Sequence, residues 1–328
     1  MIRNKIFTHN INFNRYKISP HHDLLTAIEL FILIKNIRPD LVNTITIKPT
    51  LLGGLSLILF RKINFVVSIT GLGFVFSREK SLTANIIKII VEILYKLILK
   101  RKKIYFIFQN KYDLNVIRRI LNKKITNFSL IKGSGVDLVK YSFLPLPTTK
   151  PIILFAARLL KSKGIYQFVE AAKKLDKYRF VIVGKIDSES DDCITWDELN
   201  YWENKGFIEY WGFKNNMNKI INLSNIVVLP SYYGEGLPKI LIEAAACGRP
   251  VITTDRPGCK DAVLDGKTGF IIPVKNVDLI VEKINFILNN PAKALEISVN
   301  ARNLALKEFN IKNVIEKHIE IYKEMIDK

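Results

Sequence analysis

The sequence predicts an α/β protein with two domains, each a parallel sheet covered by helices on both faces. Three observations support this. The 328 residues suit two domains of roughly 100–200 residues each. Short apolar runs alternate with segments of helical periodicity, which is typical of parallel crossovers. A loop with three prolines (144–151) stands between two such alternating halves and is the natural linker.

The first half alternates as a doubly wound sheet requires. LVNTITI, NFVVSIT and IYFIFQN each read as a buried strand, and a helical pattern lies before or between them. We expect strands at 41–47, 64–70 and 104–110, helices at 23–36, 51–60 and 112–122, and a segment at 128–135 that leads to the boundary.

The second half alternates more regularly. PIILFAA and NIVVLPS are continuous apolar runs of the kind found in strands buried on both faces. We expect strands at 151–157, 178–184, 207–212, 225–231, 250–255 and 269–273, with helices at 163–175, 238–247, 277–289 and 292–307. Ligands of such sheets bind at the carboxyl ends of the strands.

Positive charge is concentrated in the first half. Residues 1–149 contain 24 Lys and Arg against 7 Asp and Glu, whereas the net charge of the whole chain is +20. Such a field indicates an anionic partner, which could be a membrane surface, a phosphorylated acceptor or nucleic acid, and improved solubility is the plain alternative. No aromatic-basic RNA motif or helix-turn-helix pattern is present, so we expect no nucleic-acid partner.

The segment 86–103 favours a membrane surface. Its apolar residues recur at helical spacing and it ends in four consecutive cations, which suits a helix lying on an anionic leaflet. An ordinary core helix with a basic end is the alternative. The longest uncharged stretches in this half, 49–60 and 63–77, are shorter than the ~18–20 residues of a spanning helix.

The cysteines and the N-terminus point to the cytoplasm. Cys193, Cys247 and Cys259 are widely spaced and odd in number, which fits neither a disulfide framework nor a zinc site. The first residues are polar and do not form a signal peptide. We therefore expect a chain without a metal site in a reducing compartment.

The densest chemistry lies at 231–255. A strand ends at Ser231, a Gly-Glu-Gly turn follows, and Pro238 stands where a helix would start. The glycines let the backbone approach a ligand closely. Free N–H groups of Gly236 and Leu237, together with the positive helix end, would suit a diphosphate.

Four charged side chains accompany this turn. Glu235 lies on it, and Glu243 lies inside the helix, where its carboxylate could accept hydrogen bonds from a ribose diol. Arg158 and Lys163 follow the first strand of the same domain. Two cations at that edge could neutralise a diphosphate leaving group, and solvated surface cations are the alternative.

The chain resembles the retaining glycosyltransferases of family 4, which have the GT-B architecture of two Rossmann-like domains. It looks closest to bacterial members that act on undecaprenyl-diphosphate-linked glycans. The segments that carry the resemblance run from about residue 20 to the C-terminus: RPDLVNTITIKP (38–49), TGLGFVFS (70–77), GSGVD (133–137), ARLLKSKG (157–164), the block 231–255, PGCKDAV (257–263) and GKTGFIIP (266–273).

The resemblance implies a role for each candidate residue. Arg158 and Lys163 would bind the donor diphosphate, Glu235 the donor sugar and Glu243 the nucleotide ribose. Gly236 and Leu237 would also belong to the donor site. Gly184, Trp211 and Gly212 would border the base. Gly71, Gly73 and Lys48 would lie on the acceptor side.

The resemblance also implies an organisation and a reaction. Residues 1–145 would form the acceptor-side domain, 150–310 the donor domain, and 311–328 a helix that crosses back to the first domain. Transfer from a nucleotide sugar, a UDP-hexose or UDP-N-acetylhexosamine, to a lipid-linked glycan would need neither metal nor cofactor. It would take place at the inner face of the cytoplasmic membrane.

Two departures from the family pattern stand out. Met1 falls well inside the first domain, so we expect that domain to lack at least one βα unit. Asn43 stands where relatives often carry His. None of His9, His21, His22 and His318 lies in an evident catalytic setting.

Besides a glycosyltransferase, two readings stay open on these residues. A nucleotide-sugar epimerase on the same scaffold would isomerise a sugar without an acceptor. A truncated remnant would bind a nucleotide or a membrane without turnover.

Overall fold

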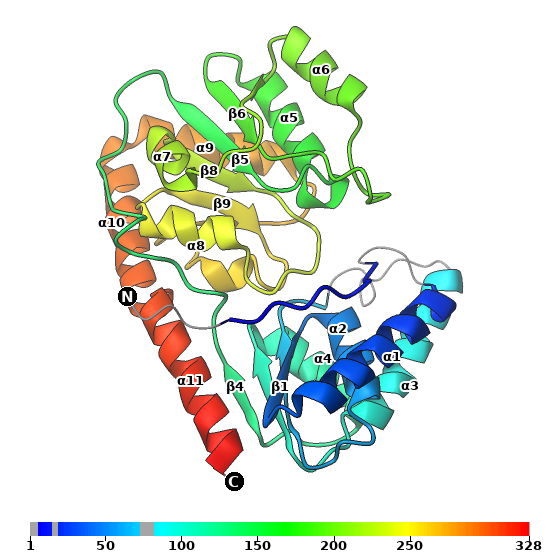
Figure 1. The fold of residues 1–328 in the computed structure, drawn as a ribbon. Helices are drawn as coiled ribbons and strands as arrows, with labels where there is room; N and C mark the ends of the chain where they lie inside the picture. Colours follow the sequence, from blue (N-terminus) through cyan, green and yellow to red (C-terminus); the bar gives the residue numbers. More distant parts are fainter. Residues whose placement is uncertain (1–5, 15–18, 73–81, 328) are drawn as a thin grey trace.

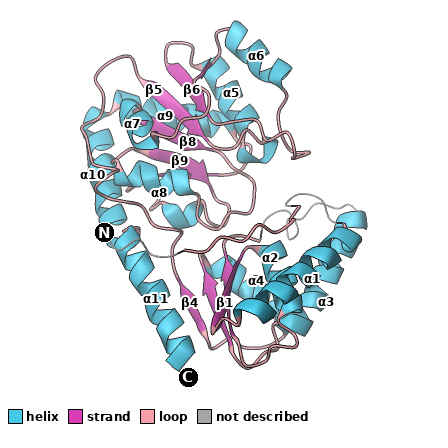
Figure 2. Cartoon of the chain, viewed as in Figure 1, coloured by secondary structure: helices cyan, strands magenta, loops and turns pink. Residues whose placement is uncertain are grey.

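The computed structural model describes residues 6–14, 19–72 and 82–327 of the chain. Two α/β domains lie one above the other, with the segment 6–14 running between them (Figure 1). Helices cover both sheets (Figure 2).

The first domain contains a parallel sheet that, within the described residues, has the order β1-β2-β3-β4. Its strands are β1 (Leu41–Ile45), β2 (Asn64–Ile69), β3 (Ile104–Phe108) and β4 (Phe128–Leu130). Its helices are α1 (Pro20–Ile37), α2 (Ile47–Ser56), α3 (Leu82–Ile98) and α4 (Lys111–Leu121). Every residue of β2 is buried, as expected for a strand covered on both faces.

The second domain has six parallel strands in the order β10-β9-β8-β5-β6-β7. They are β5 (Ile152–Ala156), β6 (Arg179–Val183), β7 (Glu209–Tyr210), β8 (Ile226–Leu229), β9 (Val251–Thr254) and β10 (Gly269–Ile272). Its helices are η2 (Lys161–Lys163), α5 (Ile165–Lys174), α6 (Trp196–Asn204), α7 (Met217–Leu223), α8 (Lys239–Ala246), η3 (Lys260–Ala262), α9 (Val277–Asn289) and α10 (Pro291–Glu308).

The last helix, α11 (Ile311–Asp327), packs on the first sheet although the second domain precedes it (Figure 1). Val314, Ile321 and Met325 share a core with strand residues Val66 and Ile107. The helix is also tied to β1, because Asn43 Nδ2 donates to Tyr322 Oη at 2.7 Å.

The tie to α11 gives Asn43 a structural role. Its Oδ1 accepts from Ser68 Oγ at 3.0 Å, so its amide links β1, β2 and α11.

The predicted α/β class and parallel sheets are confirmed, and most predicted elements lie within a few residues of their observed bounds. The helix predicted at 51–60 begins earlier, at Ile47, because Thr46 with a φ of 76° turns the chain directly after β1. The short helices α6 and α7 were not predicted. A signal for α6 was present, since Thr195 and Glu198 form a capping box.

Arg249 fixes the linker between the domains. It follows α8, is fully buried, and donates to the carbonyls of Leu144 at 2.9 Å and Pro145 at 3.2 Å, and to Asn222 Oδ1 at 3.0 Å. Burial lowers its pKa to about 10, so it remains a cation near neutral pH.

We expect Arg249→Leu to lower the free energy of unfolding by roughly 2–4 kcal/mol, because it leaves several buried carbonyls without a donor. Urea denaturation measures the loss. Arg256, which is exposed in the same domain, supplies the matched control Arg256→Leu, with an expected change below about 0.5 kcal/mol. Equal losses in the two variants would contradict this account.

Candidate active site

The candidate site is built where β8 ends and the turn to α8 begins. Lys163 and Glu235 form an ion pair there, and only 11% and 13% of their side chains are exposed. Lys163 also lies over the ring of Tyr233, 5.3 Å from its centroid. Ser231 Oγ donates to Glu235 at 3.3 Å. A cation and a carboxylate are thus held together, largely out of water, at the carboxyl end of the sheet.

The local chain explains why Lys163 reaches this turn. Gly164, with a φ of 82°, ends η2 so close to the end of β8 that an added Cβ would lie 2.2 Å from the Pro230 carbonyl oxygen. Only glycine allows that approach. The Ser162 carbonyl then accepts the Tyr232 N–H at 2.9 Å, so the loop after β5 and the loop after β8 are joined.

Arg158 lies on the same loop after β5. Its guanidinium forms an ion pair with Asp187 at 2.9 Å, and Asp187 follows β6. Both predicted cations therefore lie after the first strand of the domain, and each is paired with an acid of a neighbouring loop.

The three residues predicted to border the base lie together. The Gly184 N–H donates to the Gly212 carbonyl at 3.1 Å, and the Trp211 N–H donates to Ile182 at 3.0 Å. Gly184 has no room for a side chain, because an added Cβ would lie 1.9 Å from the Ala157 carbonyl oxygen. The ends of β5, β6 and β7 thus form one continuous edge.

Glu243 is buried in α8, with 6% of its surface exposed. Its carboxylate accepts a hydrogen bond from Tyr141, and burial raises its pKa above the ordinary range of a glutamate. Lys239 lies one helical turn away, at 4.0 Å. Its contact with a ribose stays a prediction.

On the acceptor side, Gly71 contacts the donor-domain turn directly. An added Cβ would lie 2.6 Å from the Gly236 nitrogen. Lys48 lies at the start of α2. Its Nζ forms an ion pair with Asp23 Oδ1 at 2.6 Å and donates a hydrogen bond to the Asn14 carbonyl oxygen at 2.7 Å. Gly73 lies outside the described residues.

One expectation about the turn is wrong. The Leu237 N–H, predicted to be free for an anion, donates to Gln109 Oε1 of the first domain at 3.0 Å. The first domain, packed against the turn, supplies the acceptor that the isolated turn lacks. In this arrangement that N–H is satisfied within the protein.

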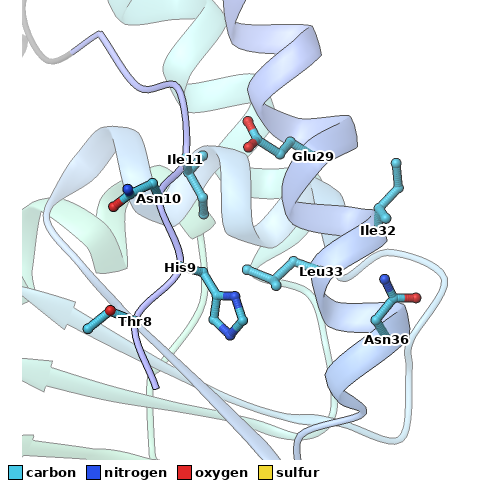
Figure 3. A pocket seen from close by; sticks show the side chains of 8 residues that line it. All are labelled: Thr8, His9, Asn10, Ile11, Glu29, Ile32, Leu33 and Asn36. Atoms are coloured by element: carbon cyan, nitrogen blue, oxygen red, sulfur yellow. The ribbon is translucent and has the colours of Figure 1, made fainter. Parts of the chain in front are cut away.

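A separate cavity of about 360 Å³ lies in the first domain (Figure 3). The segment 8–11 forms one wall and α1 the other, and His9 and Leu33 point into the space between them. Because all its lining residues belong to the first domain, this cavity is distinct from the β8–α8 turn.

Comparison with known proteins agrees with this geometry. The sequence model of the family "Glycosyl transferases group 1" matches residues 141–304, which is half of the chain, and that of "Glycosyl transferase 4-like" matches residues 2–110. The chain belongs to the group 1 glycosyltransferases.

Two relatives align with nearly the whole of this glycosyltransferase. One is the N,N'-diacetylbacillosaminyl-diphospho-undecaprenol alpha-1,3-N-acetylgalactosaminyltransferase of Campylobacter jejuni, 29% identical over 96% of this chain and 85% of the relative. The other is the UDP-Gal:alpha-D-GlcNAc-diphosphoundecaprenol alpha-1,3-galactosyltransferase of Escherichia coli, 26% identical over 94% and 81%.

Solved structures establish the GT-B fold of this glycosyltransferase. Sucrose-phosphate synthase from Thermosynechococcus elongatus superposes with a TM-score of 0.80 at 22% identity, covering 95% of this chain and 81% of that one. HepE of Anabaena in complex with UDP-glucose gives 0.76 at 17% identity, covering 95% and 85%.

The sequence did not predict three residues of the first domain of this glycosyltransferase. Gln109 and Asn110 contact the turn, and Asp113 contacts Asn110. Gln109 and Asn110 follow β3, and Asp113 lies in the first turn of α4. Asn110 donates to the Gly236 carbonyl at 3.1 Å. The Asn-x-x-Asp spacing marked a helix start, but nothing local marked its partner 126 positions away.

Within the described part of the chain, no group of three or more His, Cys, Asp or Glu side chains lies close enough to hold a metal ion.

Asp113 makes the stability of this domain junction depend on pH. Burial and the nearby Asp261 raise its pKa to about 7, against the opposing hydrogen bonds from Asn110 and Leu72. The unfolded value is about 3.9. Between these values the folded chain binds the extra proton, so Asp113 destabilises the fold progressively as the pH rises toward 7 and by a constant amount above it.

We expect the difference in melting temperature between wild type and Asp113→Asn to change between pH 5 and pH 7 and to level above pH 8. Differential scanning calorimetry across this range measures it. Asp261→Asn should move the transition to lower pH, because it removes a like charge. Parallel melting curves for wild type and Asp113→Asn would refute the assignment.

Proposed function

We propose that this glycosyltransferase moves a hexose or N-acetylhexosamine from a UDP-sugar to a polyprenyl-diphosphate-linked glycan, with retention of anomeric configuration. The observation that carries the proposal is the shielded Lys163–Glu235 pair on the turn at the end of β8. The Campylobacter and Escherichia relatives are named for transfer to undecaprenyl-diphosphate-linked sugars, and the second for a UDP donor.

The diphosphate would lie against Lys163 and Arg158. In the transition state the bond from the sugar C1 to the β-phosphate oxygen breaks, and negative charge collects on the departing diphosphate. Two cations, the shielded Lys163 and the partly exposed Arg158, would stabilise that charge, so we propose that transfer requires no metal. The acceptor hydroxyl attacks C1, and its proton passes to the departing diphosphate.

Glu235 and Glu243 would orient the donor. Because Lys163 holds the Glu235 carboxylate at the turn, that carboxylate can accept hydrogen bonds from sugar hydroxyls beside the diphosphate. Glu243 would contact the ribose, and Gly184, Trp211 and Gly212 would border the base. Gly71, Gly73 and Lys48 would lie toward the acceptor.

Family membership favours transfer over the two alternatives. An epimerase would convert the UDP-sugar without an acceptor, and a non-catalytic remnant would bind the nucleotide without turnover. Each of these two alternatives predicts a result different from transfer in a radiolabel assay with a panel of nucleotide sugars.

We expect radiolabel from one UDP-sugar, among a panel of UDP- and GDP-sugars, to enter organic-extractable lipid when the protein is mixed with bacterial membranes. Glu243→Ala should abolish donor use, and Glu235→Gln should lower kcat/KM by about 100-fold or more. Glu282→Gln, at an exposed acid of α9, is the control with unchanged turnover.

Three results would count against the proposal. Label in an isomerised nucleotide without acceptor would indicate an epimerase. UDP binding with no transfer from any donor would indicate a remnant. Unchanged turnover in Glu243→Ala would refute the site assignment.

We also propose that the enzyme works at the inner face of the cytoplasmic membrane, in peripheral contact with anionic lipid through the first domain. On α3, Ile89, Ile93 and Leu97 are 56%, 59% and 60% exposed, and Lys96 and Lys100 are exposed beside them. Their spacing places them on one helical face. An apolar stripe edged by cations suits an anionic leaflet.

No helix among the described residues is long and apolar enough to cross a bilayer. The contact that we propose lies at the membrane surface, through one face of α3.

We expect an Ile93→Glu, Leu97→Glu double variant to lose sedimentation with phosphatidylglycerol vesicles and to keep its affinity for UDP, because the change is confined to the lipid-facing helix. Leu223→Glu and Leu306→Glu together, at exposed positions of the second domain, form the control. Equal binding of wild type and the α3 variant to these vesicles would exclude this surface.

A further inference from the structure

The main chain of the Glu235 turn is held by side chains of the other domain. Gln109 Oε1 accepts the Leu237 N–H at 3.0 Å. Asn110 Nδ2 donates to the Gly236 carbonyl at 3.1 Å and to the Glu235 carbonyl at 3.3 Å. Two consecutive residues after β3 thus contact three consecutive residues of the candidate donor site.

Asn110 is itself fixed on its own side of the boundary. It is 3% exposed, and its Oδ1 accepts the Asp113 N–H at 2.8 Å as the N-cap of α4. Its Nδ2 also donates to Asp113 Oδ2 at 2.9 Å. The Asp113 carboxylate in turn accepts the Leu72 N–H. The acceptor-side loop and the donor turn therefore share one hydrogen-bond network.

Steric contact leaves the turn little room to shift. A Cβ on Gly236 would lie 2.2 Å from Gln109 Oε1 and 2.3 Å from the Thr70 carbonyl oxygen. Within the second domain, a Cβ on Gly258 would lie 2.4 Å from the Gly236 carbonyl oxygen. Residues of both domains therefore pack closely against the turn.

We propose that Gln109 and Asn110 are positioning residues for glycosyl transfer, which hold the Glu235 turn in its reactive place from across the domain boundary. This inference rests on the proposed role of Glu235. It goes further because it assigns part of the donor site's geometry to the acceptor-side domain.

A positioning role has a consequence that a purely structural role lacks. The contacts come from the first domain and hold the turn from across the domain boundary, whereas the donor nucleotide would bind to residues of the second domain. Loss of the contacts should therefore lower kcat and leave UDP affinity unchanged, since small displacements of a catalytic group cost up to about 100-fold in rate.

The test uses Asn110→Ser and Gln109→Met in the full chain. Serine keeps an N-cap oxygen for α4 but lacks the amide that reaches the two carbonyls. Methionine keeps the approximate size of Gln109 but offers the Leu237 N–H only a weak acceptor. Gln109→Glu retains a carboxyl oxygen at that place. Asn276→Ser is the matched control, because Asn276 caps α9 in the same way at 3.0 Å.

We expect kcat to fall by about 10- to 100-fold in Asn110→Ser and Gln109→Met, with the Kd for UDP, measured by titration calorimetry, unchanged. Gln109→Glu should recover most of the kcat lost in Gln109→Met. The control should match the wild type in both quantities, and melting temperatures verify that each variant is folded.

Two results would overturn the inference. One is a kcat of Asn110→Ser and Gln109→Met equal to that of the control. The other is a proportional loss of UDP affinity and kcat, which would mean a damaged donor site.

Glu235→Gln, measured alongside, distinguishes failure of the proposed role of Glu235 from failure of the positioning role of Gln109 and Asn110. If it keeps the wild-type kcat, the proposed role of Glu235 fails and the inference fails with it. If it is inactive while Asn110→Ser and Gln109→Met stay active, the inference alone fails.

Discussion

The close approach of two backbones across the domain boundary is the constraint on which the site depends. Gly71 of the first domain meets Gly236 of the second so tightly that neither position has room for a side chain. Hydrogen bonds from Asn110 and to Gln109 then satisfy polar groups that this contact removes from water. Buried main-chain groups without partners would destabilise this arrangement of the two domains. The two glycines allow the close approach of the backbones, and the side chains of Gln109 and Asn110 supply the hydrogen bonds that this approach requires.

The charges at the turn follow a second constraint. A lysine and a glutamate that are both largely buried must be paired, since an isolated charge is strongly destabilising there. Lys163 and Glu235 satisfy each other. An incoming diphosphate would place a second anion beside Lys163. That lysine would then face both the Glu235 carboxylate and the leaving group. The ion pair stabilises both buried charges when no ligand is bound, and it keeps Lys163 where an anion would bind.

The sequence predicted what is local and missed what is distant. Strands such as β5 and β8 are apolar along their whole length, so their type could be predicted directly. The turn around Glu235 was recognisable because its glycines, Pro238 and the following helix are adjacent in the chain. The partners of the turn were not, because Gln109 and Leu237 are 128 positions apart. A free N–H was predicted at Leu237 for that reason. Likewise, Asn43 forms a hydrogen bond with Tyr322, which is 279 positions away, and no local sequence pattern predicts this contact.

The division of labour between the domains follows from these contacts. The second domain carries Arg158, Lys163 and the edge proposed to border the base, whereas the first domain carries the basic, apolar face of α3 and the amides that hold the turn. If, as proposed, contacts with the first domain complete the donor geometry, a donor bound without those contacts would lack a correctly placed Glu235. Water would then compete poorly with the acceptor, because it would meet a donor without reactive geometry. With the proposed lipid-linked acceptor and the proposed membrane contact of α3, this order would preserve the activated sugar until the first domain has engaged its acceptor.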